Sequence, residues 1–175
     1  MKRVIIISLF IITAVIFETS VFPLFFSSGN APDLVAIFLI SATIVFGFRH
    51  VWLITIAAGF ILDIFSYSRI GVNVIAFIAF CYLASFFSRR LLLEEKIEGI
   101  AVGSFLILVE TFFYEIWVFS ANMGFKINDF RGLKYVLLEG IGWKLLFNLI
   151  LFFVSLLFFK RLEKAYSSKK LIIGN

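Results

Sequence analysis

The sequence predicts an all-α integral membrane protein whose residues 1–175 form one transmembrane domain, a bundle of six helices. The first observation is composition: 62% of the residues are hydrophobic and 15% are charged, whereas an ordinary soluble domain is about 45–50% apolar. The second is a mean hydropathy of +1.09. A soluble chain of this size has too large a surface for its volume to hide so much apolar area. We therefore expect lipid to cover the rest.

Six apolar runs define the predicted membrane-spanning helices. They cover residues 4–26, 34–48, 51–65, 71–87, 97–119 and 136–159. The first run continues past Glu18 to Phe26 and is longer than the apolar segment of about 7–15 residues in a signal peptide, so we expect a retained helix. The second and third runs, of about 15 residues each, give about 22 Å of helix against about 30 Å of hydrocarbon core. Because these two runs are short, five spans are the alternative to six.

The positions of lysine and arginine predict which ends of the helices face the cytoplasm. With the N-terminus inside, most of the basic residues fall in inside segments, near residues 2–3, 89–96 and 160–170. Cytoplasmic loops of membrane proteins are enriched in these residues, so we expect both termini in the cytoplasm. The net charge of +5 also favours contact with anionic lipid headgroups. The cations are dispersed over separate loops, and we therefore expect no nucleic-acid binding.

Few residues are suited to catalysis. The chain has one histidine, His50, and one cysteine, Cys81, without a glycine-rich phosphate loop or a metal-ligand spacing. The sequence therefore predicts a protein that is not an enzyme and that has no catalytic residue, metal site or cofactor.

Charged residues inside the predicted spans fall in one layer. At 1.5 Å of rise per residue, Glu18, Glu110 and Lys144 each lie about 12–15 Å below the outer end of their span. A buried charge in the bilayer is costly unless it is paired, so we expect Lys144 to pair with Glu110, with Glu18 or with both. This intramembrane polar network predicts a structural clasp, and a proton or ion path is the alternative. Glu115 and Glu139 lie at a shallower common level, where basic residues of the outer loop would neutralise them.

Polar turns are predicted at the outer ends of the helices. Asp33, which follows Pro32, is suited to cap the N-terminus of the second span. Asp63 ends the third span, where headgroup water would reach it. Gly71 permits a tight turn, and Asn73 can bond to backbone groups in the first turn of the fourth span.

Small residues are predicted to let helices approach one another closely. Gly59 lies in the third span, and Gly99 and Gly103 form a GxxxG pattern in the fifth. Helices in lipid associate through such small residues, because hydrophobicity alone gives them no preference for one another over lipid.

Several of these stretches resemble the pattern of the bacterial rod shape-determining protein MreD family. They are "APDLVAIFLISATIVFG" from Ala31, "GFILDIFS" from Gly59, "IGVNVIAF" from Ile70, and Tyr82. The shared features are a Pro-Asp that opens span two, a span three that ends in Asp, and a Gly-x-Asn that opens span four. The resemblance covers residues 31–82 most clearly and the remainder as hydropathy. Span three has fewer glycines than the family pattern.

The resemblance implies a non-enzymatic scaffold in the bacterial inner membrane that binds MreC and links it to the peptidoglycan synthesis machinery. MreB, RodA and the elongation transpeptidase are further implied partners beside membrane lipids, and self-association is left open. The family is also similar in helix arrangement to the substrate-binding subunits of energy-coupling-factor transporters. The alternative function is therefore that of a vitamin-binding subunit of such a transporter. The candidate partner-binding or structural positions are Pro32, Asp33, Gly59, Asp63, Gly71, Asn73, Gly99 and Gly103.

Overall fold

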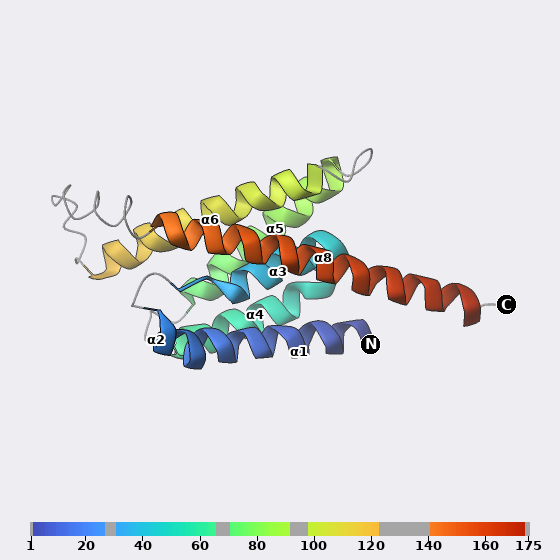
Figure 1. Cartoon of the computed structure of the whole chain (residues 1–175), viewed down its shortest axis with the longest axis horizontal. Coiled ribbons are helices and arrows are strands. Elements are labelled where there is room, and N and C mark those ends of the chain that lie inside the picture. Colours follow the sequence, from blue (N-terminus) through green and yellow to red (C-terminus); the bar gives the residue numbers. More distant parts are fainter. Residues whose placement is uncertain (1, 27–30, 66–70, 92–97, 123–140, 174–175) are drawn as a thin grey trace.

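The structure, a computed structural model, describes residues 2–26, 31–65, 71–91, 98–122 and 141–173, and every element in these ranges is helical (Figure 1). The elements are α1 (Lys2–Ile16), the π-helical turn η1 (Phe17–Val21), α2 (Phe22–Phe25), α3 (Leu34–Phe46), α4 (Phe48–Phe65), α5 (Val72–Leu91), α6 (Glu98–Asn122) and α8 (Ile141–Ile173). Because α1, η1 and α2 follow one another without a break, the described residues form six helices. The predicted all-helical class is confirmed.

The helices run back and forth along one common direction (Figure 1). The beginning of α1 and the end of α8 lie at the same end of the bundle, and the last turns of α8 extend beyond the other helices (Figure 1). The beginning of α3 lies at the opposite end, which we call the α3-start end (Figure 1). Helices that are distant in the sequence, such as α3 and α8, are packed side by side.

Among the described residues, three segments are long and apolar enough to cross a membrane. They are Ile5–Phe25, Phe48–Phe65 and Ile141–Ala165. Two shorter apolar helices cover Leu34–Phe46 and Val72–Ser88. The protein is therefore a multi-pass membrane protein.

The third predicted span is longer than the sequence suggested. The helix begins at Phe48 rather than at residue 51, and only Gly47 separates it from α3. Gly47 has a φ of 81°, a conformation that glycine adopts without the steric cost of a Cβ atom. The chain therefore reverses at a single residue, and Arg49 and His50 belong to the first turn of α4.

The continuous helix that begins with α1 contains the wider π-helical turn η1 just before Pro23. The backbone N–H of Phe22 donates to the carbonyl of Phe17, five residues earlier, which is the bond of a π-turn. Pro23 has no N–H, and its ring clashes with the carbonyl four residues before it in a regular α-helix. The widened turn removes that conflict, and it places Glu18 on an irregular stretch of helix. Such turns are frequent at functional sites.

The central element is α3, which contacts α1, α4, α5, α6 and α8 and is buried along most of its length. With 13 residues it is about 20 Å long, against about 30 Å of hydrocarbon core. The residues at its N-terminus, Asp33, Leu34 and Val35, are buried inside the bundle. The free backbone N–H groups there and any charge beside them need partners from other helices.

Two glycines that the sequence singled out are used for contacts within the chain. A Cβ atom on Gly59 would lie 2.7 Å from the Cα of Val74, on the backbone of α5. A Cβ atom on Gly103 would meet the ring of Phe152 and would lie 2.8 Å from Cδ1 of Ile44. The close approach expected at small residues is thus present, and at these two positions it joins helices of the same chain.

Candidate functional site

A cluster of buried polar side chains surrounds the N-terminus of α3. Its centre is Lys144 of α8, which is 2% exposed. The Nζ atom lies 3.0 Å from Oδ2 of Asp33 and 2.9 Å from Oε1 of Glu115. It also lies 4.7 Å from the centre of the Tyr114 ring. One ammonium therefore bridges a carboxylate at the start of α3 and a carboxylate on α6.

These ion pairs correct the predicted ones, which joined Lys144 to Glu110 or Glu18. The prediction rested on the depth of the Cα atoms and did not take into account the direction of the lysine side chain. Side chains on a helix lean toward its N-terminus, which for α8 is the α3-start end. The ammonium therefore reaches the level of Glu115, one turn beyond Glu110 on α6, and the level of Asp33.

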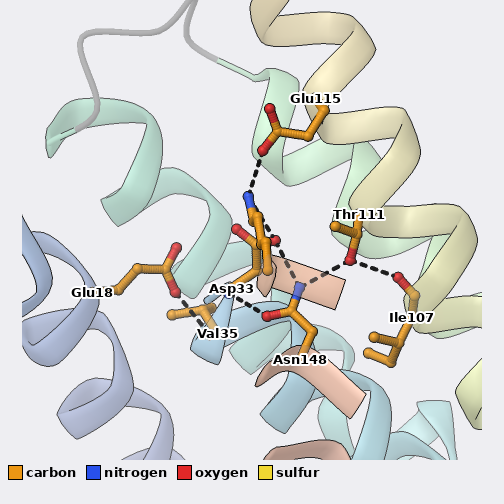
Figure 2. A network of polar contacts seen from close by, with 8 residues as sticks. Glu18, Asp33, Val35, Ile107, Thr111, Glu115 and Asn148 are labelled. Carbon is orange, nitrogen blue, oxygen red and sulfur yellow. Dashed lines mark hydrogen bonds and ion pairs between the residues drawn. The ribbon is translucent and has the colours of Figure 1, made fainter. Parts of the chain in front are cut away.

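Asn148 links the ion pair to the backbone of α3. The backbone N–H of Asp33 donates to Oδ1 of Asn148 at 3.1 Å, and Nδ2 of Asn148 donates to Oδ2 of Asp33 at 3.2 Å. The same nitrogen donates to Oγ1 of Thr111 at 2.9 Å, and Thr111 donates to the carbonyl of Ile107 at 2.8 Å. Figure 2 shows these side chains converging on one point from three places: Asp33 from the start of α3, Thr111 and Glu115 from α6, and Asn148 from α8.

Asn148 and Thr111 were not predicted from the sequence as members of the cluster. A signal for Asn148 was present, because residues four apart lie on one face of a helix and Asn148 follows Lys144 by that spacing. A polar pair on one face of an otherwise apolar helix indicates that the face is turned toward the bundle interior. Thr111 carries no comparable signal, since threonine is common in membrane helices.

The capping group of α3 comes from another helix. Asp33 occupies the N-cap position, as predicted, but its side chain makes no capping bond. Instead, Oε2 of Glu18 accepts the backbone N–H of Val35 at 2.9 Å, and Figure 2 shows Glu18 reaching the start of α3 from the neighbouring helix. The reason is that Lys144 and Asn148 already engage the Asp33 carboxylate. Glu18 therefore ties the irregular turn η1 to α3.

The side chain of Glu110 is not bound in the way that the side chain of Glu18 is. It is 4% exposed, and its Oε2 atom has no hydrogen-bond partner among the described residues. It lines a cavity of about 240 Å³ beside the cluster. The other lining residues are Glu18, Thr19, Pro23, Ala31, Pro32, Asp33, Leu62, Phe65, Asn73, Phe77, Tyr114 and Lys144. The predicted network residues Glu18, Glu110 and Lys144 therefore meet at one cavity, although Lys144 bonds to neither carboxylate.

A second set of polar contacts joins α4 to α5. Oδ2 of Asp63 accepts the backbone N–H of Gly71 at 2.7 Å, and Oδ1 accepts the backbone N–H of Asn73 at 3.0 Å. Gly71 has a φ of 101°. Asp63 is 1% exposed, so the expectation that headgroup water solvates it is wrong. Its carboxylate is satisfied by the free N–H groups at the start of α5.

Some of the predicted positions cannot be placed in a site. Glu139 and the outer loop at 123–135 lie outside the described residues. Gly99 is within α6, but its surroundings also lie outside the described part of the chain. Within the described ranges, no group of three or more His, Cys, Asp and Glu side chains is placed to hold a metal ion.

Comparison with known proteins identifies the family. No curated protein and no solved structure gives a significant match to the chain, so no structural neighbour supports the similarity to energy-coupling-factor subunits. The family model described as rod shape-determining protein MreD matches residues 1–164. The match covers every helix described above except the last turns of α8. This chain therefore belongs to the MreD family of rod shape-determining proteins, a family of non-catalytic membrane proteins whose role is in determining cell shape.

Proposed function

We propose that this protein is a non-enzymatic scaffold of the bacterial cell-wall elongation complex, which binds MreC and links it to the peptidoglycan synthesis machinery. The observation that carries the proposal is the family match over residues 1–164. MreB, RodA and the elongation transpeptidase are the further partners in this proposal. The chain crosses the cytoplasmic membrane six times, and both termini are cytoplasmic.

The bracing of the helices supports a scaffold role. Lys144 and Asn148 join α8 to α3 and α6, and Asp63 joins α4 to the start of α5. Polar contacts between membrane helices have few competing partners in lipid, so they hold the helices in one arrangement. A protein that presents helix faces to several partners needs these faces in fixed positions.

The partner-binding faces in this proposal do not include Gly59 and Gly103. Gly59 and Gly103 are occupied by α5 and α8 of the same chain, so they offer no contact to MreC. Both α4 and α8 also have an exposed side. On α4 it contains the large side chains Trp52, Ile56, Phe60 and Ile64, and on α8 it contains Trp143, Ile150, Val154 and Leu157. We propose one of these two faces as the contact for the MreC membrane segment.

The test is recovery of MreC with the full chain from detergent-solubilised membranes, together with restoration of rod shape in cells that lack their own family member. Alanine at Phe60 and Ile64 tests the α4 face, and alanine at Ile150 and Val154 provides the matched test of the α8 face. We expect one pair to lose both MreC and rod shape while the other keeps both, with membrane insertion checked in each case. If the unmodified chain recovers neither MreC nor any other elongation protein, the scaffold proposal fails.

The cavity is the one observation that favours the second candidate function, a vitamin-binding subunit of an energy-coupling-factor transporter. Its mostly apolar lining with a few polar side chains is a feature of small-ligand sites. This candidate predicts that the purified chain binds a vitamin at nanomolar concentration and copurifies with an energising ATPase module. Copurification of MreC without such a module would exclude it.

A further inference from the structure

The cavity beside the ion-pair cluster is lined by more acidic than basic side chains. Its described lining contains the carboxylates of Glu18, Asp33 and Glu110 and the ammonium of Lys144. Lys144 is already bound by Asp33 and by Glu115, at 3.0 and 2.9 Å. Lys144 is therefore already engaged, and neither Glu18 nor Glu110 has an ion-pair partner among the described residues that line the cavity.

Glu110 indicates what kind of group the cavity would bind. The side chain is 4% exposed, and its Oε2 atom has no hydrogen-bond donor among the described residues. A buried carboxylate without partners is strongly unfavourable, because it has lost its hydration and gained nothing in return. Glu110 also lines the cavity, so a donor that enters the cavity can reach this carboxyl group.

The other lining residues indicate what kind of donor fits. Tyr114, Phe77 and Phe65 add aromatic rings to the wall, and aromatic faces attract cations. Tyr114 already lies 4.7 Å from the ammonium of Lys144. The volume of about 240 Å³ is smaller than the roughly 300–1,000 Å³ of sites for drug-sized ligands. The described residues also place no set of ligands for a metal ion, so a small organic cation fits better.

The cavity has an accessible rim. Phe65 and Pro23 line it and are exposed, and they belong to α4 and α2. Glu18 and Thr19, on the irregular turn η1, are half-buried. A ligand can therefore enter between these helices without unfolding the bundle.

We propose that this cavity binds an alkylammonium group, which donates a hydrogen bond to Glu110 and is neutralised by Glu110 and Glu18. Two sources carry this chemistry: the headgroup of an aminophospholipid and a free small amine. The inference goes beyond the scaffold function and does not depend on it, because the cavity lies inside the bundle and the proposed MreC faces lie on its outside.

The first experiment measures the midpoint temperature of unfolding, Tm, of the full chain in detergent. The probe is ethanolamine hydrochloride, with sodium chloride at the same ionic strength and ethylene glycol, an uncharged analogue, as controls. A ligand at ten times its Kd is expected to raise Tm by about 3–6 °C for a chain of this size. We expect that rise with ethanolamine and not with either control.

Nanodiscs of different lipids distinguish the two possible sources of the amine. Discs of phosphatidylethanolamine are compared with discs of phosphatidylcholine and phosphatidylglycerol. A higher Tm in phosphatidylethanolamine without a response to free ethanolamine assigns a lipid headgroup, and a response to free ethanolamine assigns a soluble amine. Either result supports the proposal.

The variant Glu110→Gln tests the role of the carboxylate, because glutamine keeps the shape of the side chain and removes its charge. We expect it to lose the amine response while it still recovers MreC, which separates this inference from the scaffold proposal. Glu18→Gln, whose amide oxygen can still accept the N–H of Val35, should weaken the response. The proposal is overturned if neither ethanolamine nor phosphatidylethanolamine changes the Tm of the unmodified chain, or if Glu110→Gln responds as strongly as the unmodified chain.

Discussion

Asp33 and Asn148, which are 115 residues apart in the chain, exchange two hydrogen bonds. The Asp33 oxygen that accepts from Asn148 is also the oxygen that lies 3.0 Å from Nζ of Lys144. A single carboxylate oxygen thus receives both an amide and an ammonium from one face of α8. Because the groups share this atom, the start of α3, the lysine and the asparagine should respond to substitution as one unit.

Replacing Lys144 with methionine should strongly destabilise the protein. Methionine keeps much of the volume but leaves the buried carboxylates of Asp33 and Glu115 without a cation, a change that costs about 3–5 kcal/mol in other proteins. The free energy of unfolding in detergent measures the loss. The matched control is Lys160→Met in the second half of α8, where the side chain is half-buried and we expect a much smaller effect.

A double-mutant cycle should identify the partner of Lys144. Adding Glu115→Gln to Lys144→Met removes one of the stranded charges, so we expect it to recover part of the loss, with a coupling of about 0.5–3 kcal/mol. Adding Glu110→Gln should recover less, since Glu110 makes no hydrogen bond to the lysine. A larger coupling to Glu110 than to Glu115 would contradict the contacts described here.

Two glycine-to-alanine substitutions should have opposite effects. Gly71 has a φ of 101°, although an added Cβ atom would meet no other atom within 4 Å. Alanine there should cost about 1–2 kcal/mol through backbone strain alone. Gly142 in α8 also has open space around it and is helical, so alanine should be neutral or stabilise by up to about 1 kcal/mol. Thermal unfolding followed by helix content compares them, and equal effects would argue against strain at Gly71.

Alanine at Gly59 and alanine at Gly103 should both destabilise the protein. A second substitution should relieve the effect only at Gly103. At Gly59 the new methyl group meets the backbone of Val74, so α4 and α5 must separate, and no side-chain change relieves the clash. At Gly103 it meets the side chains of Phe152 and Ile44. We expect Phe152→Leu to make Gly103→Ala less destabilising than the sum of the two single effects. Full additivity of this pair would exclude the contact.

The proposed orientation in the membrane predicts opposite labelling at the two ends of the bundle. The end of α6 at Asn122 and the last turns of α8 lie at opposite ends (Figure 1). In a Cys81→Ser background, Asn122→Cys should react with an impermeant thiol reagent added to intact cells, and Ser168→Cys should react only after the membrane is opened. Labelling of Ser168→Cys in intact cells would place the C-terminus outside.

The sequence by itself determined the membrane class, the helical content, the approximate position of each described helix and the family. These properties depend on the residues of one segment at a time, because each segment enters lipid according to its own hydropathy. It also identified Glu18, Glu110 and Lys144 as charges within the spans, since depth follows from the rise per residue. The starting residue of α3 was also predictable, because the suitability of Asp33 as an N-cap after Pro32 depends only on neighbouring residues.

Only the tertiary structure decided which groups meet. The pairing of Lys144 with Asp33 and Glu115 depends on the rotation of α8, on the lean of its side chains and on how deeply the short helix α3 begins. The burial of Asp63, the internal use of Gly59 and the lack of a donor to Oε2 of Glu110 among the described residues likewise follow from packing between different helices. Hydropathy is nearly the same for many rotations of a helix, whereas hydrogen bonds and close backbone contacts change with every few ångströms.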